Sequence, residues 1–213
     1  MIEAVFAIPG DIGLPTGGYV YARRVLALLP QAGVAVRRLE LPGSFPAPRA
    51  ADLAETARRL EAVAPGAVVM IDGLAFGAMP AAVIRRVRGP IVALVHHPLC
   101  LEAGLSQARQ DELYGLERAA LALAQRIVVT SPGTARSLTA DFAVPAERIA
   151  VAEPGTDPAP RAPGSGGPGL QLLGVGSIIP RKAYDVLVRA LAPLKDRDWR
   201  LTIAGAVDRS PEA

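Results

Sequence analysis

The sequence contains few cysteine, aromatic and histidine residues, and each shortage excludes kinds of protein. Cys100 is the only cysteine in 213 residues, so the chain can hold neither an internal disulfide nor a zinc site built from several cysteines. We expect this thiol to be buried and inert in a reducing cytoplasm. Four Phe, four Tyr and one Trp offer little surface for stacking bases, and the net charge of +3 is spread over separate arginine pairs. We therefore expect no nucleic-acid partner.

Long apolar runs are also missing. No stretch approaches the ~20 apolar residues that a membrane-spanning helix needs, and no basic segment precedes the first apolar run, Ile2–Ile8. Half of the residues are hydrophobic and a fifth are charged, which is typical of a globular protein with a real core. We expect a cytoplasmic protein, and the small positive charge is compatible with an acidic ligand or a peripheral contact with a membrane surface.

Short apolar runs alternate with amphipathic segments along most of the chain. The runs predicted as strands are Ile2–Ile8, Val34–Leu39, Ala67–Ile71, Ile91–Val95, Arg126–Thr130, Ile149–Ala152, Leu170–Val175 and Trp199–Ala204. The predicted helices are Tyr19–Leu29, Ala51–Val63, Pro80–Val87, Gln107–Ala124, a helix starting at Ser131-Pro132, and Lys182–Leu194. Alternation of this kind predicts an α/β protein with a parallel sheet covered by helices on both faces.

A change of composition divides the chain. Residues 153–169 are rich in proline and glycine and have no periodic apolar face, so we interpret them as a linker. We predict a Rossmann-like first domain over residues 1–152 and a partial second domain over residues 170–213. A strand-helix-strand unit of this size cannot bury a core of its own. It either packs on the first domain or begins a domain that continues elsewhere.

Three motifs lie where predicted strands of the first domain end. The glycine-rich loop Pro9–Gly18 lies between the first strand and the first helix, where backbone amides can approach a ligand. The chain's two histidines, His96 and His97, follow a buried strand; either could hydrogen-bond a hydroxyl-rich ligand or be a satisfied structural histidine. Adjacent histidines on an extended segment point in opposite directions, so we predict no metal site. Asp72-Gly73 is explained by a simple turn.

The stretch Leu170–Lys182 reads as a strand, a glycine loop and a helix start with two cations beside it. This geometry can hold a phosphate group. Arginine outnumbers lysine by 21 to 2 in this chain, which makes Lys182 next to Arg181 distinctive. The Gly174-Val175-Gly176 sequence lacks the third glycine of a dinucleotide fingerprint, so a nicotinamide cofactor is not indicated.

Several blocks together resemble the retaining family 4 glycosyltransferases of the GT-B fold. They are the PTGG sequence that opens the first helix, LVHHP, the segment from RIVVTSPGTARSL to AVAEPGTD, and GVGSIIPRKAYDVLVRAL followed by WRLTIAG. The resemblance implies two Rossmann-like domains facing each other across a cleft, with a nucleotide-diphosphate sugar as donor and a glycan, lipid or small molecule as acceptor. It implies no cofactor and no metal ion.

The resemblance also implies roles for individual residues. The catalytic candidates are His96, which would contact the donor sugar, and Arg181 and Lys182, which would neutralise the departing diphosphate. The other candidates, for binding the donor diphosphate or the acceptor, are Gly17, Gly18, His97, Ser177 and Gly205. Ser177 stands where many relatives have arginine, and Arg181 is placed to compensate for it.

The sequence ends before the glutamate-rich motif of this family. The acidic residues near the end do not reproduce that motif; they are Asp185, Asp196, Asp198, Asp208 and Glu212. We therefore expect a truncated enzyme that is inactive alone. Two alternatives are a noncatalytic binding subunit completed by a partner chain, and a sugar-nucleotide epimerase on the same architecture. The epimerase would need carboxylates at the crevice, where the sequence offers only Asp72.

Overall fold

The structure is a computed structural model that describes residues 2–207. The chain divides into two compact units, Met1–Gly155 and Thr156–Ala213, and each is described here by itself. Residues 152–169 contain no helix or strand. Asp208 and Glu212, which we weighed as members of an acidic motif, lie outside the described residues.

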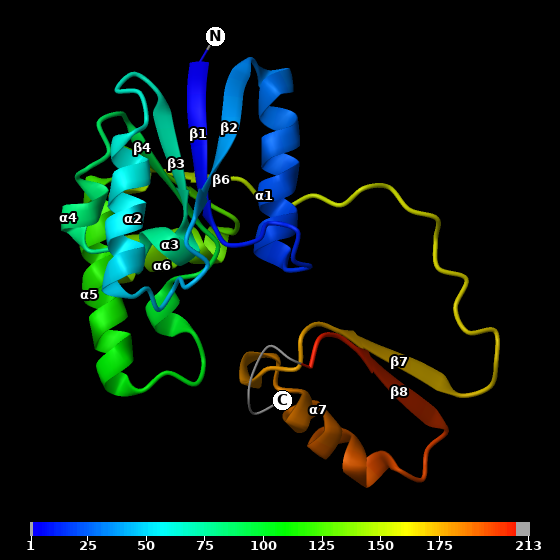
Figure 1. The fold of residues 1–213 in the computed structure, drawn as a ribbon. Coiled ribbons are helices and arrows are strands. Elements are labelled where there is room, and N and C mark those ends of the chain that lie inside the picture. Colours follow the sequence, from blue (N-terminus) through cyan, green and yellow to red (C-terminus); the bar gives the residue numbers. More distant parts are fainter. Residues whose placement is uncertain (1, 208–213) are drawn as a thin grey trace. The chain divides into compact units, whose positions relative to one another are not determined.

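The first unit is built on a sheet of parallel strands (Figure 1). The strands are β1 (Ile2–Pro9), β2 (Val34–Leu41), β3 (Val68–Asp72), β4 (Ile91–Val95), β5 (Arg126–Val129) and β6 (Ile149–Val151). Their order is β2-β1-β3-β4-β5-β6, so the chain moves outward from β1 to β2 and then returns to β3. This reversal is the switch point at which open α/β sheets bind ligands. The predicted parallel sheet is confirmed.

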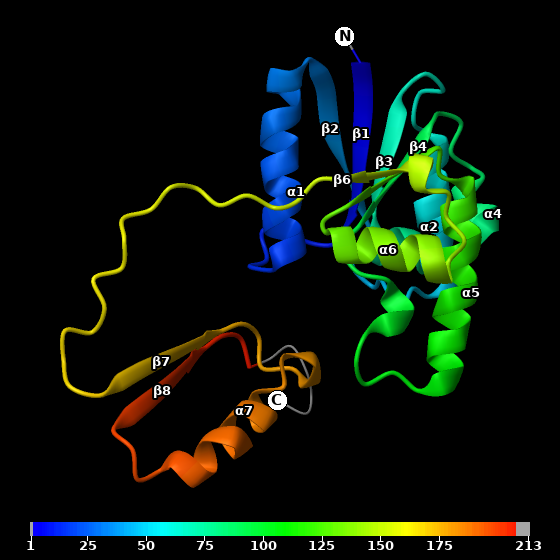
Figure 2. The ribbon, with the colours of Figure 1, turned by 180° about the vertical axis from the view of Figure 1, so that it is seen from behind.

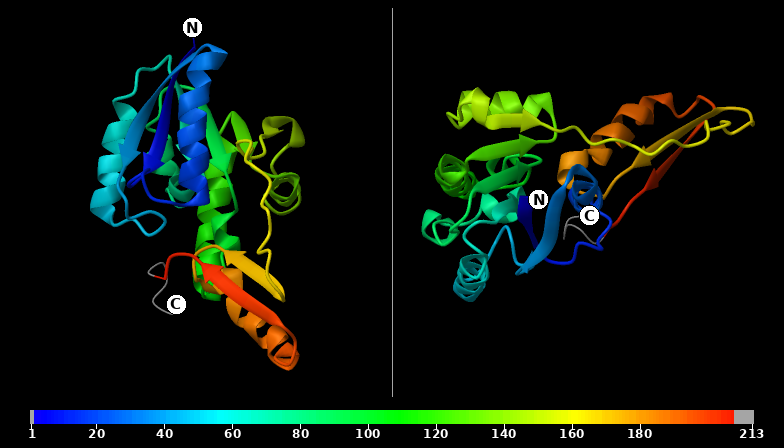
Figure 3. Two further views of the ribbon diagram at one scale, coloured as in Figure 1. Left: turned by 90° about the vertical axis from the view of Figure 1, so that its right-hand side faces the viewer. Right: turned by 90° about the horizontal axis from the view of Figure 1, so that it is seen from above.

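Helices cover both faces of this sheet (Figures 2 and 3). They are α1 (Gly17–Leu28), α2 (Ala50–Glu61), α3 (Gly73–Phe76), α4 (Ala81–Ile84), α5 (Gln107–Leu123) and α6 (Pro132–Asp141). Because strand side chains alternate between faces, Phe6 and Ile8 pack with Ala22 of α1 on one side. Val5 and Ala7 belong to the larger core on the other side, which also contains Leu60 of α2 and residues of α4 and α5.

The second unit is a strand-helix-strand motif. β7 (Leu170–Val175) pairs in parallel with β8 (Trp199–Ala204), and α7 (Tyr184–Leu191) connects them. The prediction that this helix starts at Lys182 is wrong. Lys182 ends a separate 3-10 turn, Pro180–Lys182, and Ala183 then adopts the left-handed conformation with φ of 50° before α7 begins.

Three other predicted boundaries need correction. Gly17 and Gly18 form the first turn of α1 instead of ending the preceding loop, because the Thr16 side chain caps that helix. The predicted helix Pro80–Val87 is shorter in the structure, where α4 spans Ala81–Ile84. Asp72-Gly73, which we predicted to be a turn, forms the start of helix α3. By contrast, the helix start at Ser131-Pro132 is confirmed, since Ser131 Oγ accepts from the Thr134 amide.

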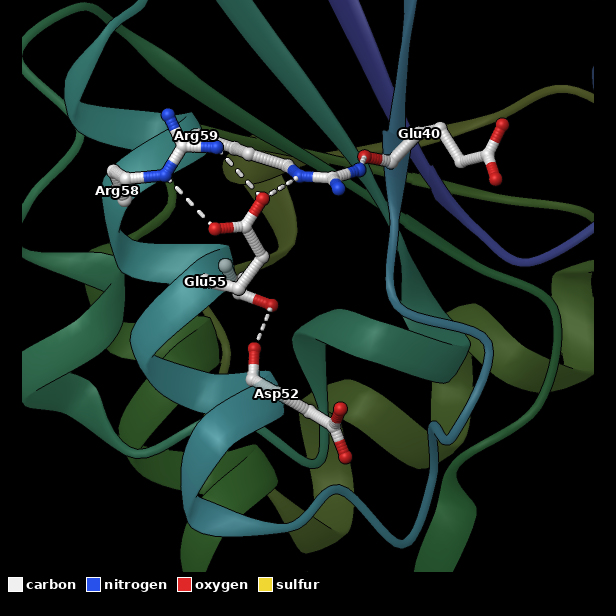
Figure 4. A network of polar contacts seen from close by, with 6 residues as sticks. Glu40, Asp52, Glu55, Arg58 and Arg59 are labelled. Carbon is white, nitrogen blue, oxygen red and sulfur yellow. Dashed lines mark hydrogen bonds and ion pairs between the residues drawn. The ribbon is translucent and has the colours of Figure 1, made fainter.

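A group of charged side chains ties α2 to the end of β2 (Figure 4). Arg59 Nε donates to Glu55 Oε1 at 2.6 Å, and Arg59 Nη1 donates to the Glu40 carbonyl at 2.5 Å. Arg58 donates two hydrogen bonds to the same Glu55 carboxylate. These bonds from Arg58 and Arg59 lower the pKa of Glu55 to about 2. Of these two arginines, Arg59 links the helix to the strand, whereas Arg58 bonds within the helix.

We expect Arg59→Ala to destabilise the first unit more than Arg58→Ala does. Loss of the charged hydrogen bond between α2 and β2 should lower the free energy of unfolding by about 1 kcal/mol. Arg58 is more exposed, so water screens its ion pair with Glu55 and its loss should cost less. Urea unfolding of the two variants measures the difference, and equal losses would contradict the tie between helix and strand.

Candidate functional site

The loop between β1 and α1 is fixed by hydrogen bonds from several directions. The Tyr19 hydroxyl donates to the Pro9 carbonyl at 2.7 Å, and Arg38 Nη2 donates to the Gly10 carbonyl at 2.6 Å. Within the loop, Asp11 Oδ1 accepts from the Gly13 amide at 2.8 Å. The loop is therefore held in one shape at the carboxyl edge of the sheet, where it leads into the first turn of α1.

His96 lies against that first turn. A Cβ atom built on Gly18 would stand 3.5 Å from both Cδ2 and Nε2 of the imidazole, which is ordinary van der Waals contact. The Tyr21 ring meets the imidazole edge-on, with centroids 5.3 Å apart and an interplanar angle of 88°. Thr134 Oγ1 donates to the His96 carbonyl at 3.2 Å. The imidazole is thus held by α1 on one side and its backbone by α6.

The other sequence-predicted residues of this unit are more open. Among the described residues, no atom lies within 4 Å of a Cβ built on Gly17, so the space above this glycine is free. His97 is exposed, while the His96 side chain keeps 29% of its surface accessible. The structure therefore brings Gly18 and His96 together and leaves His97 apart from that contact.

Asp72, which we read as part of a simple turn, lies beside this imidazole. Its Oδ2 atom is 4.0 Å from His96 Nε2, and its Oδ1 accepts from the Leu74 amide at 2.9 Å, which caps α3. Asp72 is 3% exposed, and burial raises its pKa to about 6. Burial also lowers the pKa of His96, which favours the neutral imidazole. The sequence signal that could have identified Asp72 as a site residue is its position as a carboxylate at the end of a buried strand.

Gly73 makes this proximity sterically feasible. A Cβ on Gly73 would stand 2.8 Å from the Leu94 carbonyl oxygen and 3.3 Å from the Cα atom of Val95. Real Cβ atoms do not approach backbone oxygen so closely, so only glycine lets the segment after β3 lie against the end of β4. Asp72, the last residue of β3, and His96, the first residue after β4, are neighbours for this reason.

Glu117 of α5 supports the loop that follows the histidines, and our sequence analysis did not identify it. Its Oε2 accepts from the Leu99 amide at 2.9 Å, and the Cys100 amide also bonds to the carboxylate. A Cβ built on Gly77, directly after α3, would stand 2.9 Å from Oε1. Glu117 is 1% exposed, and burial raises its pKa to about 7. One buried carboxyl group therefore contacts both the segment after Asp72 and the segment after His96.

Cys100, in the same loop, is a free, buried thiol, as predicted. Burial, followed by the charge of Glu117, raises its pKa. Within residues 2–207 there is no group of three or more His, Cys, Asp or Glu side chains that could hold a metal ion. In the same part of the chain, no helix has the length and apolar character needed to cross a membrane.

In the second unit, the loop after β7 packs tightly on the loop after β8. The Gly176 amide donates to the Ala204 carbonyl at 3.0 Å. A Cβ on Gly205 would stand 1.8 Å from the Gly176 carbonyl oxygen and 3.1 Å from the Ser177 amide nitrogen, so this position has room only for glycine. Ser177 and Gly205 are thereby neighbours.

The aliphatic part of Lys182 lies along the same loop. Its Cε atom would be 3.4 Å from a Cβ on Gly176, whose φ of 151° is in the range that favours glycine. The Tyr184 hydroxyl donates to the Gly176 carbonyl at 3.3 Å. Arg181 and Lys182 are both exposed. The structure thus gathers four of the predicted residues, Ser177, Arg181, Lys182 and Gly205, around or next to one glycine loop.

This architecture is that of GT-B glycosyltransferases, as predicted. A glycosyltransferase from Rickettsia africae ESF-5 superposes with a TM-score of 0.65 at 15% identity, covering 99% of this chain and 62% of that one. The Arabidopsis thaliana protein UGT89C1, solved in complex with UDP-L-rhamnose, has a TM-score of 0.50 at 12% identity, covering 100% of this chain and 71% of that one. At these identities the likeness establishes the fold. This chain spans 62% of the length of the Rickettsia protein.

Residues 9–155 match the model of the glycosyl transferase 4-like domain. This is more than half of the chain, and the chain belongs to that family. The matched residues include the loop after β1, Asp72 and His96. A search of curated proteins gave no match.

We expect Glu117→Gln to become more stable relative to the native protein as the pH rises. The pKa of Glu117 is raised from 4.5 to about 7, so folding favours the protonated carboxyl group. The native protein loses this stabilisation as the pH rises through about 7, whereas glutamine keeps a neutral acceptor for the Leu99 amide. The full shift corresponds to a relative gain on the order of 3 kcal/mol between about pH 4 and about pH 8.

Urea unfolding at a series of pH values measures this gain. Glu112→Gln on the same helix is the matched control, because Glu112 is exposed and its loss should give little pH-dependent difference. A pH profile of Glu117→Gln that runs parallel to that of the native protein would show that Glu117 is ionised in the fold.

Proposed function

We propose that this chain is part of a glycosyltransferase that transfers a sugar from a nucleotide-diphosphate sugar to an acceptor, with retention of anomeric configuration. The observation that carries the proposal is the placement of His96 in a glycosyl transferase 4-like domain. It lies at the carboxyl edge of the sheet, between Asp72 and the first turn of α1. Retention rests on the sequence resemblance. The single cysteine supports a cytoplasmic location.

The second unit would bind the donor diphosphate. When the glycosidic bond to the nucleotide breaks, negative charge develops on the departing diphosphate. Lys182 is an exposed cation beside the Gly176 loop, and Arg181, which precedes it, is exposed as well. Cations already in place at the developing charge favour the transition state over the bound substrate. The protein's own side chains would supply this stabilisation without a metal ion or another cofactor.

The first unit would bind the acceptor and contact the transferred sugar. The free space above Gly17 and the accessible part of His96 lie at the same edge of the sheet. An imidazole kept neutral by burial can exchange hydrogen bonds with sugar hydroxyls. The acceptor would be a glycan, a lipid or a small molecule. UGT89C1, which binds a UDP-sugar on a related fold, supports the donor class.

We further propose that the second unit forms only part of the donor site, and that turnover requires a further segment or a partner chain. Leu173 and Val175 of β7 are 69% and 72% exposed, although parallel sheets are ordinarily covered on both faces. This open apolar face also favours the second candidate function, a noncatalytic subunit completed by another chain. If a partner chain proves to hold the whole donor site, the second candidate is correct.

We expect Lys182→Ala to weaken binding of nucleoside diphosphates by about tenfold or more, since a charge-assisted hydrogen bond contributes about 1.5–3 kcal/mol. Lys195→Ala is the control, because Lys195 is the chain's other lysine and is also exposed. Calorimetric titration with UDP, GDP and ADP measures the affinities, in this chain and in a version extended at its C-terminus.

The outcomes of these titrations separate the alternatives. Binding by the extended version alone would show that residues beyond this chain complete the donor site. Equal affinities of Lys182→Ala and Lys195→Ala would remove Lys182 from the diphosphate site. If neither version binds or turns over UDP-, GDP- or ADP-sugars, the proposed function is wrong.

A further inference from the structure

The Nε2 atom of His96 lies near the carboxyl group of Asp72. It is buried and has no hydrogen-bond partner among the described residues. The carboxyl oxygen Oδ2 of Asp72 lies 4.0 Å away, just beyond hydrogen-bond distance. A buried polar nitrogen without a partner is costly, and a small approach of the two side chains would satisfy it.

The Asp72 carboxyl group is itself held in place. Its Oδ1 accepts from the Leu74 amide at 2.9 Å, which leaves Oδ2 as the oxygen that faces the imidazole. Gly73 fixes the approach of this segment to the end of β4. The carboxyl group therefore has little freedom to turn toward another donor.

The imidazole is also restricted on its other sides. Its Cδ2 edge lies against Gly18, and the Tyr21 ring packs on it edge-on. The Tyr21 hydroxyl donates to the Ala152 carbonyl at 2.9 Å, which holds that ring. Because Nε2 is buried, the 29% of the side chain that remains exposed lies away from that atom, and Nδ1 is the other nitrogen of the ring.

We propose that Asp72 is a positioning residue that holds His96 with a proton on Nε2, turned toward the carboxyl group, and so leaves Nδ1 as the nitrogen presented to the ligand. Presented in this way, Nδ1 accepts a hydrogen bond. The ligand group it selects is a hydroxyl donor, and the identification of that hydroxyl as belonging to a sugar rests on the proposed function.

The chemistry of the two groups supports this arrangement. Burial raises the pKa of Asp72 to about 6, so the carboxyl group is mainly ionised at pH 8 and can only accept. Burial lowers the pKa of His96, so the imidazole is neutral there and has one N–H to donate. Tyr21 is the other titratable group in contact with the ring, and burial raises its pKa, which keeps it uncharged.

Asp72→Ser is the variant that separates positioning from support of the fold. Serine is as good a helix cap as aspartate, so the bond to the Leu74 amide can persist. Its side chain is too short to reach Nε2 as the carboxyl group does. Ser106→Ala is the matched control, because it removes the side-chain cap of another helix, α5.

Long-range proton-nitrogen NMR spectra of the imidazoles at pH 8 test the proposal directly. The chain has two histidines, and His97→Gln assigns their signals. We expect native His96 to carry its proton on Nε2, with that proton protected from exchange with water. In Asp72→Ser, we expect this protection to be lost and the Nδ1-protonated form to become detectable. Ser106→Ala should leave the His96 signals unchanged.

A pH titration of the same signals gives a second measure. Without the nearby carboxylate, His96 should bind its proton about threefold more weakly in Asp72→Ser, which lowers its pKa. A native imidazole protonated on Nδ1 would overturn the proposal. Unchanged His96 signals and titration in Asp72→Ser would also overturn it. None of these measurements uses a nucleotide sugar, so failure to bind such donors would remove the proposed function and leave the assignment of Asp72 standing.

Discussion

The first unit's site depends on how closely the segment after β3 approaches the end of β4. With 2.8 Å between a Cβ on Gly73 and the Leu94 oxygen, any side chain at that position would push the two segments apart. The approach has two consequences. The carboxyl group of Asp72 is near the imidazole of His96, and both groups are shielded enough for burial to raise the pKa of Asp72 and lower that of His96, which in each case favours the uncharged form. Packing of backbone against backbone thus sets the electrostatics of the site.

Buried carboxyl groups stabilise the two loops that carry this pair. Asp72 caps α3 from inside its own loop, and Glu117 reaches from α5 to the amides of the loop after His96. A buried, ionised carboxylate is costly, and backbone amides offset only part of that cost. The part of the desolvation cost that these amides do not offset raises the pKa values of Asp72 and Glu117. The site keeps its shape at the expense of stability at alkaline pH.

Much of the fold followed from the sequence because apolar runs and helix caps are local signals. The order of the strands in the sheet, including the reversal between β2 and β3, cannot be predicted from local patterns in the sequence. The elements that the sequence analysis missed have physical reasons. Helix α3 has four residues, which are too few to show a 3.6-residue period. Ala183 adopts a left-handed conformation, which an alanine in the sequence does not indicate. The pairing of Asp72 with His96 joins the ends of two strands and depends on the packing at Gly73.

Glu117 could have been found from the sequence. It lies four residues after Leu113 and three before Ala120, which places a charged side chain on the buried face of α5. The buried residues of α5 are Leu113, Glu117, Ala120 and Leu121. A carboxyl group on the core side of a helix needs hydrogen-bond donors, and in the structure these are the amides of Leu99 and Cys100.

The two units differ in how far their titratable side chains are exposed to water. In the first, the groups at the site are half-buried or buried, neighbouring side chains fix them, and their charges are suppressed by burial. In the second, Arg181 and Lys182 are exposed next to a rigid glycine loop, so water screens their charges until something displaces it. An anionic ligand that excludes water would therefore gain most of its binding energy in the second unit. A neutral, hydroxyl-bearing group would find a hydrogen-bonding side chain already held in place in the first.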